Sequence, residues 1–247
     1  MPLKVILDYS PNFNSKKRAS KTIKFIIFHY TGMKSESGAL NRLTDIQSEV
    51  SSHYLIKKNG EIIKLVPDLY IAWHAGRSTW QNYKSLNQNS IGIEITNPGH
   101  ENGYKKFTQK QISSLLKLSK FLIKKHKINP KNILGHSDIA VQRKKDPGEK
   151  FPWEYLSKNK IGIWHTLNKQ ELIKNRKLKI NKIVESIFFN NLFKIGYSKE
   201  YPKDKDKNKY LRELTKNFQR RFRQELVNGK IDQECLLISK SLIKAYN

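Results

Sequence analysis

The strand patterns of this chain lie within its first 135 residues, and helical patterns alternate with them. Five short apolar runs have the length and composition of strands, at residues 23–28, 54–57, 61–65, 90–95 and 132–135. Asn59-Gly60 separates the second run from the third, and this dipeptide closes hairpins because both residues tolerate positive φ. Strands that alternate with helices and include one hairpin predict an α/β domain with a mixed central β-sheet flanked by helices.

Two helical patterns fall between these strands. Residues 37–49 carry apolar side chains three positions apart. At 108–126 an apolar stripe follows Thr108 and Gln111, whose spacing is that of a capping box. From 136 to 153 the chain is polar and contains the turn residues Asp-Pro-Gly, so this stretch is predicted to be a long ordered loop.

The remainder of the chain has a different pattern, because no strand signal follows residue 170. Three helices are predicted instead, at residues 180–193, 209–226 and 232–246, with a charged loop at 201–207. We therefore expect two domains, an α/β domain at 1–168 and a small all-α domain at 169–247.

Cysteine usage and apolar content narrow the class of protein. Cys235 is the single cysteine, which excludes an internal disulfide framework and a cysteine-rich metal site. No window approaches eighteen consecutive apolar residues, so no membrane span is predicted. The apolar run in Met1–Asp8 is too short for a secretory signal. These features predict a cytoplasmic protein, with non-standard export to the periplasm or cell envelope as the alternative.

The net charge of +27 arises from 48 Lys and Arg against 21 Asp and Glu. Such an excess attracts polyanions, including nucleic acid, anionic lipid and acidic cell-wall polymers. Lysines occur in nearly every segment rather than in one stripe. This distribution favours general solvation and weak polyanion attraction over a dedicated nucleic-acid surface.

Two histidines leave buried strands, where α/β sheets gather ligands and metals. They are His29 and His136, and Asp146 follows ten residues after the second. Two imidazoles and one carboxylate can hold a tetrahedral Zn²⁺ and leave its fourth position open. Bound zinc lowers the pKa of water towards 7 and polarises a scissile carbonyl. The alternative is that all three are ordinary polar residues at the starts of loops.

Two further charged residues are candidates for catalysis. Glu94 interrupts the apolar strand 90–95, and a carboxylate there is costly to bury unless it is paired or functional. In a cleft it would accept a proton from water and pass it on. Lys144, two residues before Asp146, would place an ammonium against an oxyanion. The alternatives are that Glu94 faces solvent on an edge strand and that Lys144 is an ordinary surface lysine.

Five segments in order resemble one known family: IIFHYTGM at 26–33, VSSHYLI at 50–56, AWHAG at 72–76, NSIGIEI at 89–95, and GHSDIA through RKKDPG to FPW at 135–153. The chain resembles the zinc-dependent N-acetylmuramoyl-L-alanine amidases of the AmpD/AmiD (Amidase_2) family. The tail resembles a three-helix peptidoglycan-binding domain at 192–197, 215–223 and 229–232. A generic helical bundle that packs on the enzyme is the alternative for the tail.

The family resemblance implies a role for each candidate. His29, His136 and Asp146 match the ligands of one Zn²⁺ per chain, Glu94 matches the catalytic acid/base, and Lys144 matches the residue that stabilises the tetrahedral intermediate. Two cleft residues are expected to contact the substrate, namely His74 and Trp73. The other histidines are expected to be structural (His53) or to be surface or hydrogen-bonded polar residues (His100, His126 and His165).

The resemblance implies hydrolysis of the amide between N-acetylmuramic acid, or its 1,6-anhydro form, and L-alanine of the stem peptide. The expected partners are peptidoglycan or anhydro-muropeptides, without nucleic acid, and the oligomeric state is left open. A catalytically inactive peptidoglycan receptor would retain the fold without needing metal. A nucleic-acid-binding protein would depend on charge alone and would show a steep salt dependence.

Overall fold

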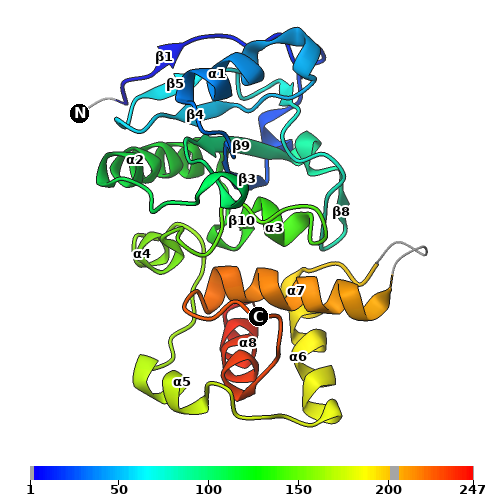
Figure 1. The fold of residues 1–247 in the computed structure, drawn as a ribbon. Helices are drawn as coiled ribbons and strands as arrows, with labels where there is room; N and C mark the ends of the chain where they lie inside the picture. Colours follow the sequence, from blue (N-terminus) through cyan, green and yellow to red (C-terminus); the bar gives the residue numbers. More distant parts are fainter. Residues whose placement is uncertain (1–2, 201–205, 247) are drawn as a thin grey trace.

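The computed structural model describes residues 3–200 and 206–246. A six-stranded mixed sheet forms its centre, in the order β1-β5-β4-β9-β3-β10 (Figure 1). The β4–β5 hairpin is antiparallel and every other neighbouring pair in this sheet is parallel. Its strands are β1 (Ile6–Leu7), β3 (Phe25–Tyr30), β4 (Tyr54–Ile56), β5 (Ile62–Lys64), β9 (Ser90–Ile95) and β10 (Ile133–Gly135). The mixed sheet, the flanking helices and the hairpin confirm the predicted fold class.

Shorter elements surround the sheet. Two small antiparallel pairs, β2 with β6 and β7 with β8, comprise Phe13–Asn14, Ile71–Ala72, Thr79–Trp80 and Tyr83–Lys84. The helices of this part are α1 (Glu36–Thr44), α2 (Gln109–His126), α3 (His136–Ile139) and α4 (Trp153–Lys158). Single 3₁₀ turns lie at Ser20–Thr22, Ile46–Ser48, Leu86–Asn89, His100–Asn102 and Pro130–Asn132.

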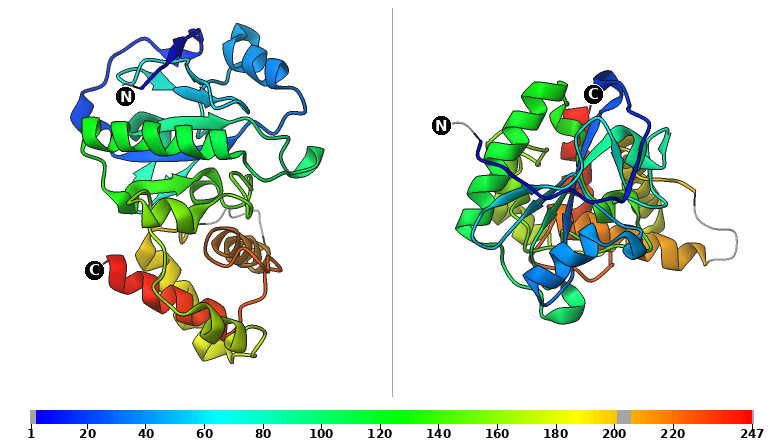
Figure 2. Two further views of the ribbon diagram at one scale, coloured as in Figure 1. Left: turned by 90° about the vertical axis from the view of Figure 1, so that its left-hand side faces the viewer. Right: turned by 90° about the horizontal axis from the view of Figure 1, so that it is seen from above.

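Helix α2 covers one face of the sheet (Figure 2). The Thr108 side chain accepts from the Gln111 backbone N–H, and the Gln111 side chain accepts in return, so the predicted capping box is present. The buried side chains of α2 join one hydrophobic cluster with alternate residues of β3 and β9, including Leu115, Leu118, Leu122, Ile26, Phe28, Ile91 and Ile93. The 3.6-residue spacing of the stripe explains why one side of this helix faces the core.

The helical region after residue 168 consists of α5 (Lys169–Asn175), α6 (Lys182–Ile195), α7 (Lys207–Phe222) and α8 (Gln233–Tyr246). These helices lie together at one end of the molecule, with α7 beside α3 (Figures 1 and 2). The buried side chains of α6, α7 and α8 form one cluster that continues to Phe25, Ile27 and Leu134 of the sheet. Apolar contact therefore runs from the helical region into β3 and β10, and the boundary at 168/169 stays a prediction.

The structure differs from the sequence expectations at particular points. His29 lies inside β3 rather than beyond its end, and residues 136–139 form helix α3 where a loop was predicted. Helices α4 and α5 were not predicted. Residues 201–205 of the expected charged loop at 201–207 lie outside the described residues. Residues 1–2 of the segment Met1–Asp8 also lie outside them. Among the helices described here, none is both long and apolar enough to cross a membrane.

Candidate metal centre

A pocket of about 340 Å³ opens where β3, β9 and β10 end. In a sheet of parallel strands, this carboxyl edge is the usual location of a ligand site. The walls include most of the residues singled out from the sequence, namely Trp73, His74, Glu94, His136, Lys144 and Asp146. His29 lies directly behind them, with 1% of its surface exposed.

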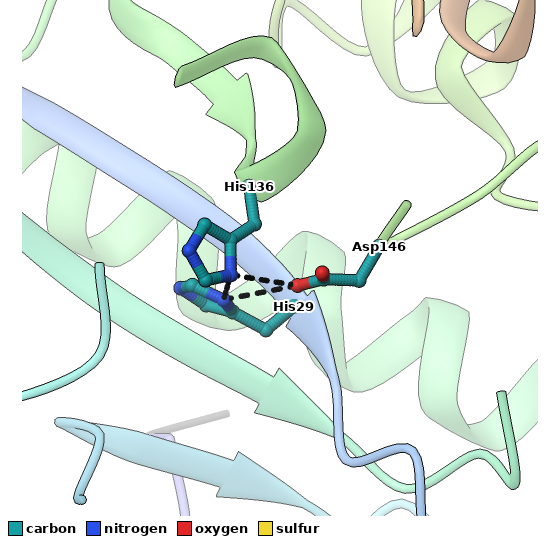
Figure 3. Close-up of side chains that lie close together, drawn as sticks. All are labelled: His29, His136 and Asp146. Atoms are coloured by element: carbon teal, nitrogen blue, oxygen red, sulfur yellow. Dashed lines mark hydrogen bonds and ion pairs between the residues drawn. The ribbon is translucent and has the colours of Figure 1, made fainter. Parts of the chain in front are cut away.

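Three side chains from distant parts of the chain meet at the back of this pocket (Figure 3). Strand β10 pairs with β3 so that Gly135 lies opposite Phe28, which brings His136 beside His29. The two Nδ1 atoms are 2.9 Å apart, and each lies 3.1 Å from Oδ2 of Asp146. All three residues are buried.

The hydrogen bonds behind His29 determine where its ring proton lies. The Ser90 hydroxyl donates to the Leu86 carbonyl, 2.6 Å away, so Ser90 Oγ accepts from Nε2 of His74 at 3.1 Å. Nδ1 of His74 therefore carries no proton, and it accepts from Nε2 of His29 at 3.0 Å. This chain of bonds leaves Nδ1 of His29 as a bare lone pair that faces the centre of the group.

The second imidazole is oriented in the same way. Nε2 of His136 lies 3.1 Å from the Ala75 carbonyl, which can only accept, so the proton of a neutral His136 ring lies on Nε2 and leaves Nδ1 bare. The backbone N–H groups of His74 and Ala75 both donate to the Asn87 side-chain oxygen, which holds that carbonyl in place. Burial is the main cause that lowers the pKa of His29 to about 4, so this imidazole is neutral at pH 7.

Two bare imidazole nitrogens and a carboxylate oxygen thus converge. Their separations of 2.9, 3.1 and 3.1 Å are close to the ~3.3 Å expected between tetrahedral ligands that bind zinc at about 2.0–2.1 Å. Lone pairs this close repel one another unless a cation or a proton lies between them. The arrangement can bind a metal ion, and its two nitrogens and one oxygen suit Zn²⁺.

Glu94 lies next to this group. In the β3–β9 pairing it is the register partner of His29, so both side chains leave the same face of the sheet. Within the described residues its Oε2 is buried and has no hydrogen-bond partner. Burial, with a contribution from Asp146, raises the pKa of Glu94 to about 8, although Lys144 opposes the shift. A carboxyl group with one buried, unpartnered oxygen beside a candidate cation site is suited to proton transfer.

The other predicted residues occupy different parts of the pocket. Lys144 is half-buried in the wall, and within the described part of the chain its ammonium group has no ion-pair partner. Trp73 lies at the wall and donates from Nε1 to Asn14 at 2.6 Å. His74 is buried, and both of its ring nitrogens are used, by His29 and Ser90.

The remaining histidines lie outside the group. Nδ1 of His53 accepts from the Gly92 N–H, while His100 and His126 each contact a carboxylate. His165 is half-exposed and bonds to the Phe222 backbone, while its Nδ1 is buried without a partner in the described residues. The sequence interpretation did not identify Ser90 or Asn87 as supports of the site, because serine and asparagine carry no pattern that marks this role.

The order of the segments and the geometry agree with a match to known proteins. The sequence profile described as N-acetylmuramoyl-L-alanine amidase matches residues 19–149, just over half of the chain. The chain belongs to the N-acetylmuramoyl-L-alanine amidase family. The candidate metal-binding group, Glu94 and the pocket wall fall inside the matched range.

Individual relatives extend the similarity beyond this range. The N-acetylmuramoyl-L-alanine amidase AmiD of Escherichia coli K12 is 35% identical over 239 residues, covering 91% of this chain and 83% of AmiD. The 1,6-anhydro-N-acetylmuramyl-L-alanine amidase AmpD of Haemophilus influenzae is 34% identical over 167 residues, 60% of this chain and 88% of AmpD. The alignment with AmiD therefore includes most of the helical region.

Solved structures of the family show the same architecture. E. coli AmiD, in complex with anhydro-N-acetylmuramic acid-L-Ala-D-γ-Glu-L-Lys, has a TM-score of 0.78 at 35% identity, covering 94% of this chain and 93% of that structure. AmpDh3 of Pseudomonas aeruginosa has a TM-score of 0.79 at 30% identity, covering 97% of this chain and 98% of that structure. AmpDh3 has also been solved with an anhydromuramic pentapeptide.

Proposed function

We propose that this amidase uses one Zn²⁺ to hydrolyse the amide between N-acetylmuramic acid, or its 1,6-anhydro form, and L-alanine of the stem peptide. The family membership and the muropeptides bound by AmiD and AmpDh3 support the bond and the substrate class. The proposal that the protein binds zinc depends on one observation. Two imidazole nitrogens and one carboxylate oxygen converge within 3.1 Å of one another.

His29, His136 and Asp146 would hold the ion. Zinc bound there supplies a Lewis acid that polarises the scissile carbonyl and lowers the pKa of water. In its ionised form Glu94 takes a proton from the attacking water, and the same carboxyl group then protonates the departing amine of L-alanine. The lack of a hydrogen-bond partner for Oε2 among the described residues supports this role, because an oxygen that no protein group engages is free to exchange a proton with a reactant.

Lys144 stabilises the negative charge that develops on the carbonyl oxygen. Its ammonium group lines the same pocket as Glu94 and Asp146. A fixed positive charge aimed at an oxyanion lowers the barrier because little reorganisation is needed during the reaction.

Two residues expected to contact the substrate have different surroundings. Trp73 is positioned in the pocket wall, where its indole can pack against a sugar or the stem peptide. His74 also lines the pocket, but its two nitrogens are bonded to His29 and Ser90. We infer that His74 acts mainly by orienting His29.

Mass analysis of products tests the proposal. The protein is incubated with anhydro-muropeptides and with intact murein, each with and without a chelator. Release of free stem peptide that the chelator abolishes and added zinc restores is the expected result. Zinc binding without hydrolysis would indicate a receptor, and hydrolysis unaffected by chelation would reject the metal mechanism. The cytoplasmic location stays a prediction, as does glycan binding by residues 169–247.

A further inference from the structure

The segment from residue 136 to 151 carries two of the three candidate metal ligands, and helix α7 contacts both of its halves. Asn217 of α7 is fully buried, and its amide donates to the carbonyls of Ser137 at 2.8 Å and Val141 at 2.9 Å. One side chain of the helical region therefore holds the start and the end of the turn formed by α3, whose first residue is His136.

A buried ion pair between α7 and α3 holds the same turn. Arg221 of α7 donates to Oδ2 of Asp138 at 2.5 Å, and both side chains are at most 2% exposed. The same Asp138 oxygen accepts from the Gly135 N–H at 2.8 Å, the residue directly before His136. Arg221 also donates to the Ile133 carbonyl in β10, so it links the end of this strand to α3.

The half of the segment that carries Asp146 is held as well. The Ser137 N–H donates to the Asp146 carbonyl at 2.8 Å, so the two halves are joined directly. Glu149 lies 3.9 Å from Arg220 of α7, and the Gln224 side chain, just past the helix, donates to the Phe151 carbonyl at 2.7 Å. These contacts begin three residues after Asp146.

We propose that α7 is a positioning element of the metal centre. Asn217 and Arg221 hold the backbone of residues 135–141 so that His136 and Asp146 stay at metal-binding separation before any ion arrives. The inference rests on the proposed metal site, and it gives the helical region a role in catalysis that is independent of glycan binding. A helical region that merely packs on the enzyme would contribute stability without changing the affinity for the ion.

The test compares three variants of the full-length chain. Asn217→Leu removes both hydrogen bonds to the turn, and Arg221→Met removes the ion pair with Asp138. Arg223→Met is the matched control, because Arg223 is also a buried arginine at the end of α7, yet its partners, Asp232, Glu234, Leu226 and Asn228, all lie within the helical region. Zinc dissociation constants are measured by competition with a chromogenic chelator, and amide exchange of residues 135–151 is measured in the zinc-free protein.

We expect Asn217→Leu and Arg221→Met to weaken zinc binding about 10- to 100-fold, the range found when outer supports of metal ligands are lost. Amide exchange in residues 135–151 should accelerate in these two variants. Arg223→Met should lower the melting temperature and leave zinc affinity unchanged, because its partners lie outside residues 135–151. Folded Asn217→Leu and Arg221→Met proteins with wild-type affinity would overturn the inference, as would an equal loss in Arg223→Met.

Two provisions keep the outcome interpretable. If Asn217→Leu and Arg221→Met do not fold, zinc affinity is measured in Gln224→Ala instead. This variant loses the hydrogen bond from the Gln224 side chain to the Phe151 carbonyl. A weaker zinc affinity in Gln224→Ala supports the inference, and an unchanged one rejects it. If the wild-type protein itself binds no zinc, the proposed function fails, and the variants do not enter that conclusion.

Discussion

His29 and Glu94 lie opposite each other on the adjacent parallel strands β3 and β9. Their side chains share one face of the sheet, at the edge where the pocket opens. His29 is hydrogen-bonded through Nε2 to His74, and Glu94 has a buried oxygen without a partner in the described residues. The strand register thus places the proposed proton acceptor beside a proposed metal ligand.

Replacing the proton acceptor should separate chemistry from metal binding. Glu94→Gln keeps the shape of the side chain but cannot take a proton, so kcat should fall about 10²- to 10⁴-fold. Zinc content should be unchanged, because Glu94 belongs to none of the three ligand contacts. Metal analysis and turnover of anhydro-muropeptide check the prediction. Near-wild-type turnover would contradict the assigned role of Glu94.

The raised pKa of Glu94 predicts a pH dependence of stability in the zinc-free protein. Burial raises this pKa from its ordinary value of 4.5 to about 8, so between these values the folded protein retains a proton that the unfolded chain releases. The contribution of protonated Glu94 to the free energy of unfolding is therefore fully present below pH 4.5, and it is lost as pH rises through 8. Urea unfolding of zinc-free wild type and Glu94→Gln across pH 5–9 should show this loss in the wild type only.

Adjacent lysines offer a matched test of oxyanion stabilisation. Lys144 and Lys145 both line the pocket, but Lys144 has no ion-pair partner in the described residues, whereas Lys145 pairs with exposed Glu101 at 2.8 Å. Lys144→Met should reduce kcat about 10²- to 10³-fold, as the loss of one oxyanion donor does elsewhere. Lys145→Met should change kcat little, since exposed ion pairs contribute about 0–1 kcal/mol. Equal effects of the two changes would reject the role given to Lys144.

The orientation of His29 should depend on a serine outside the pocket. Ser90→Ala removes the acceptor of the His74 Nε2 proton, so His74 no longer holds one tautomer and His29 loses its fixed partner. Zinc affinity should fall about 10- to 100-fold, as for other outer supports. Chelator competition measures it.

Ser239→Ala is the control for that change. Ser239 is also a buried serine that donates to a backbone carbonyl and accepts from a side chain, Asn191, but it lies in α8. Its replacement should lower stability by about 1 kcal/mol and leave zinc affinity unchanged. A similar loss of affinity in both variants would mean that general destabilisation explains the effect.

Local signals account for the parts of the fold that the sequence predicted well. Strand β9 and helix α2 were predicted nearly to their ends, because an apolar run and a capping box are written within a few residues. Helix α3 was missed, since its four residues are held by contacts with Asn217 and Asp146, which no local pattern reveals.

The candidate site was likewise predicted only where a local sequence signal marks its residues. Family segments marked His29, His136 and Asp146, but spacing along the chain left them as one of many His/His/Asp combinations. Their meeting depends on the pairing of β10 with β3, which joins positions 107 residues apart. The support by Ser90 requires three successive hydrogen bonds, and sequence alone does not order them.

Adding one methyl group at Gly92, which packs against the His74 ring, should weaken zinc binding. A Cβ at Gly92 would lie 2.4 Å from Cγ of His74 and 2.6 Å from Cδ2, closer than such atoms approach. Gly92→Ala should therefore displace the imidazole, break its bond to His29 and lower zinc affinity at least about 10-fold. Gly38→Ala is the control, because a Cβ in helix α1 meets its neighbours at 3.5 Å or more and alanine favours helix. Zinc affinity equal to wild type in folded Gly92→Ala would show that His74 does not orient the ligand.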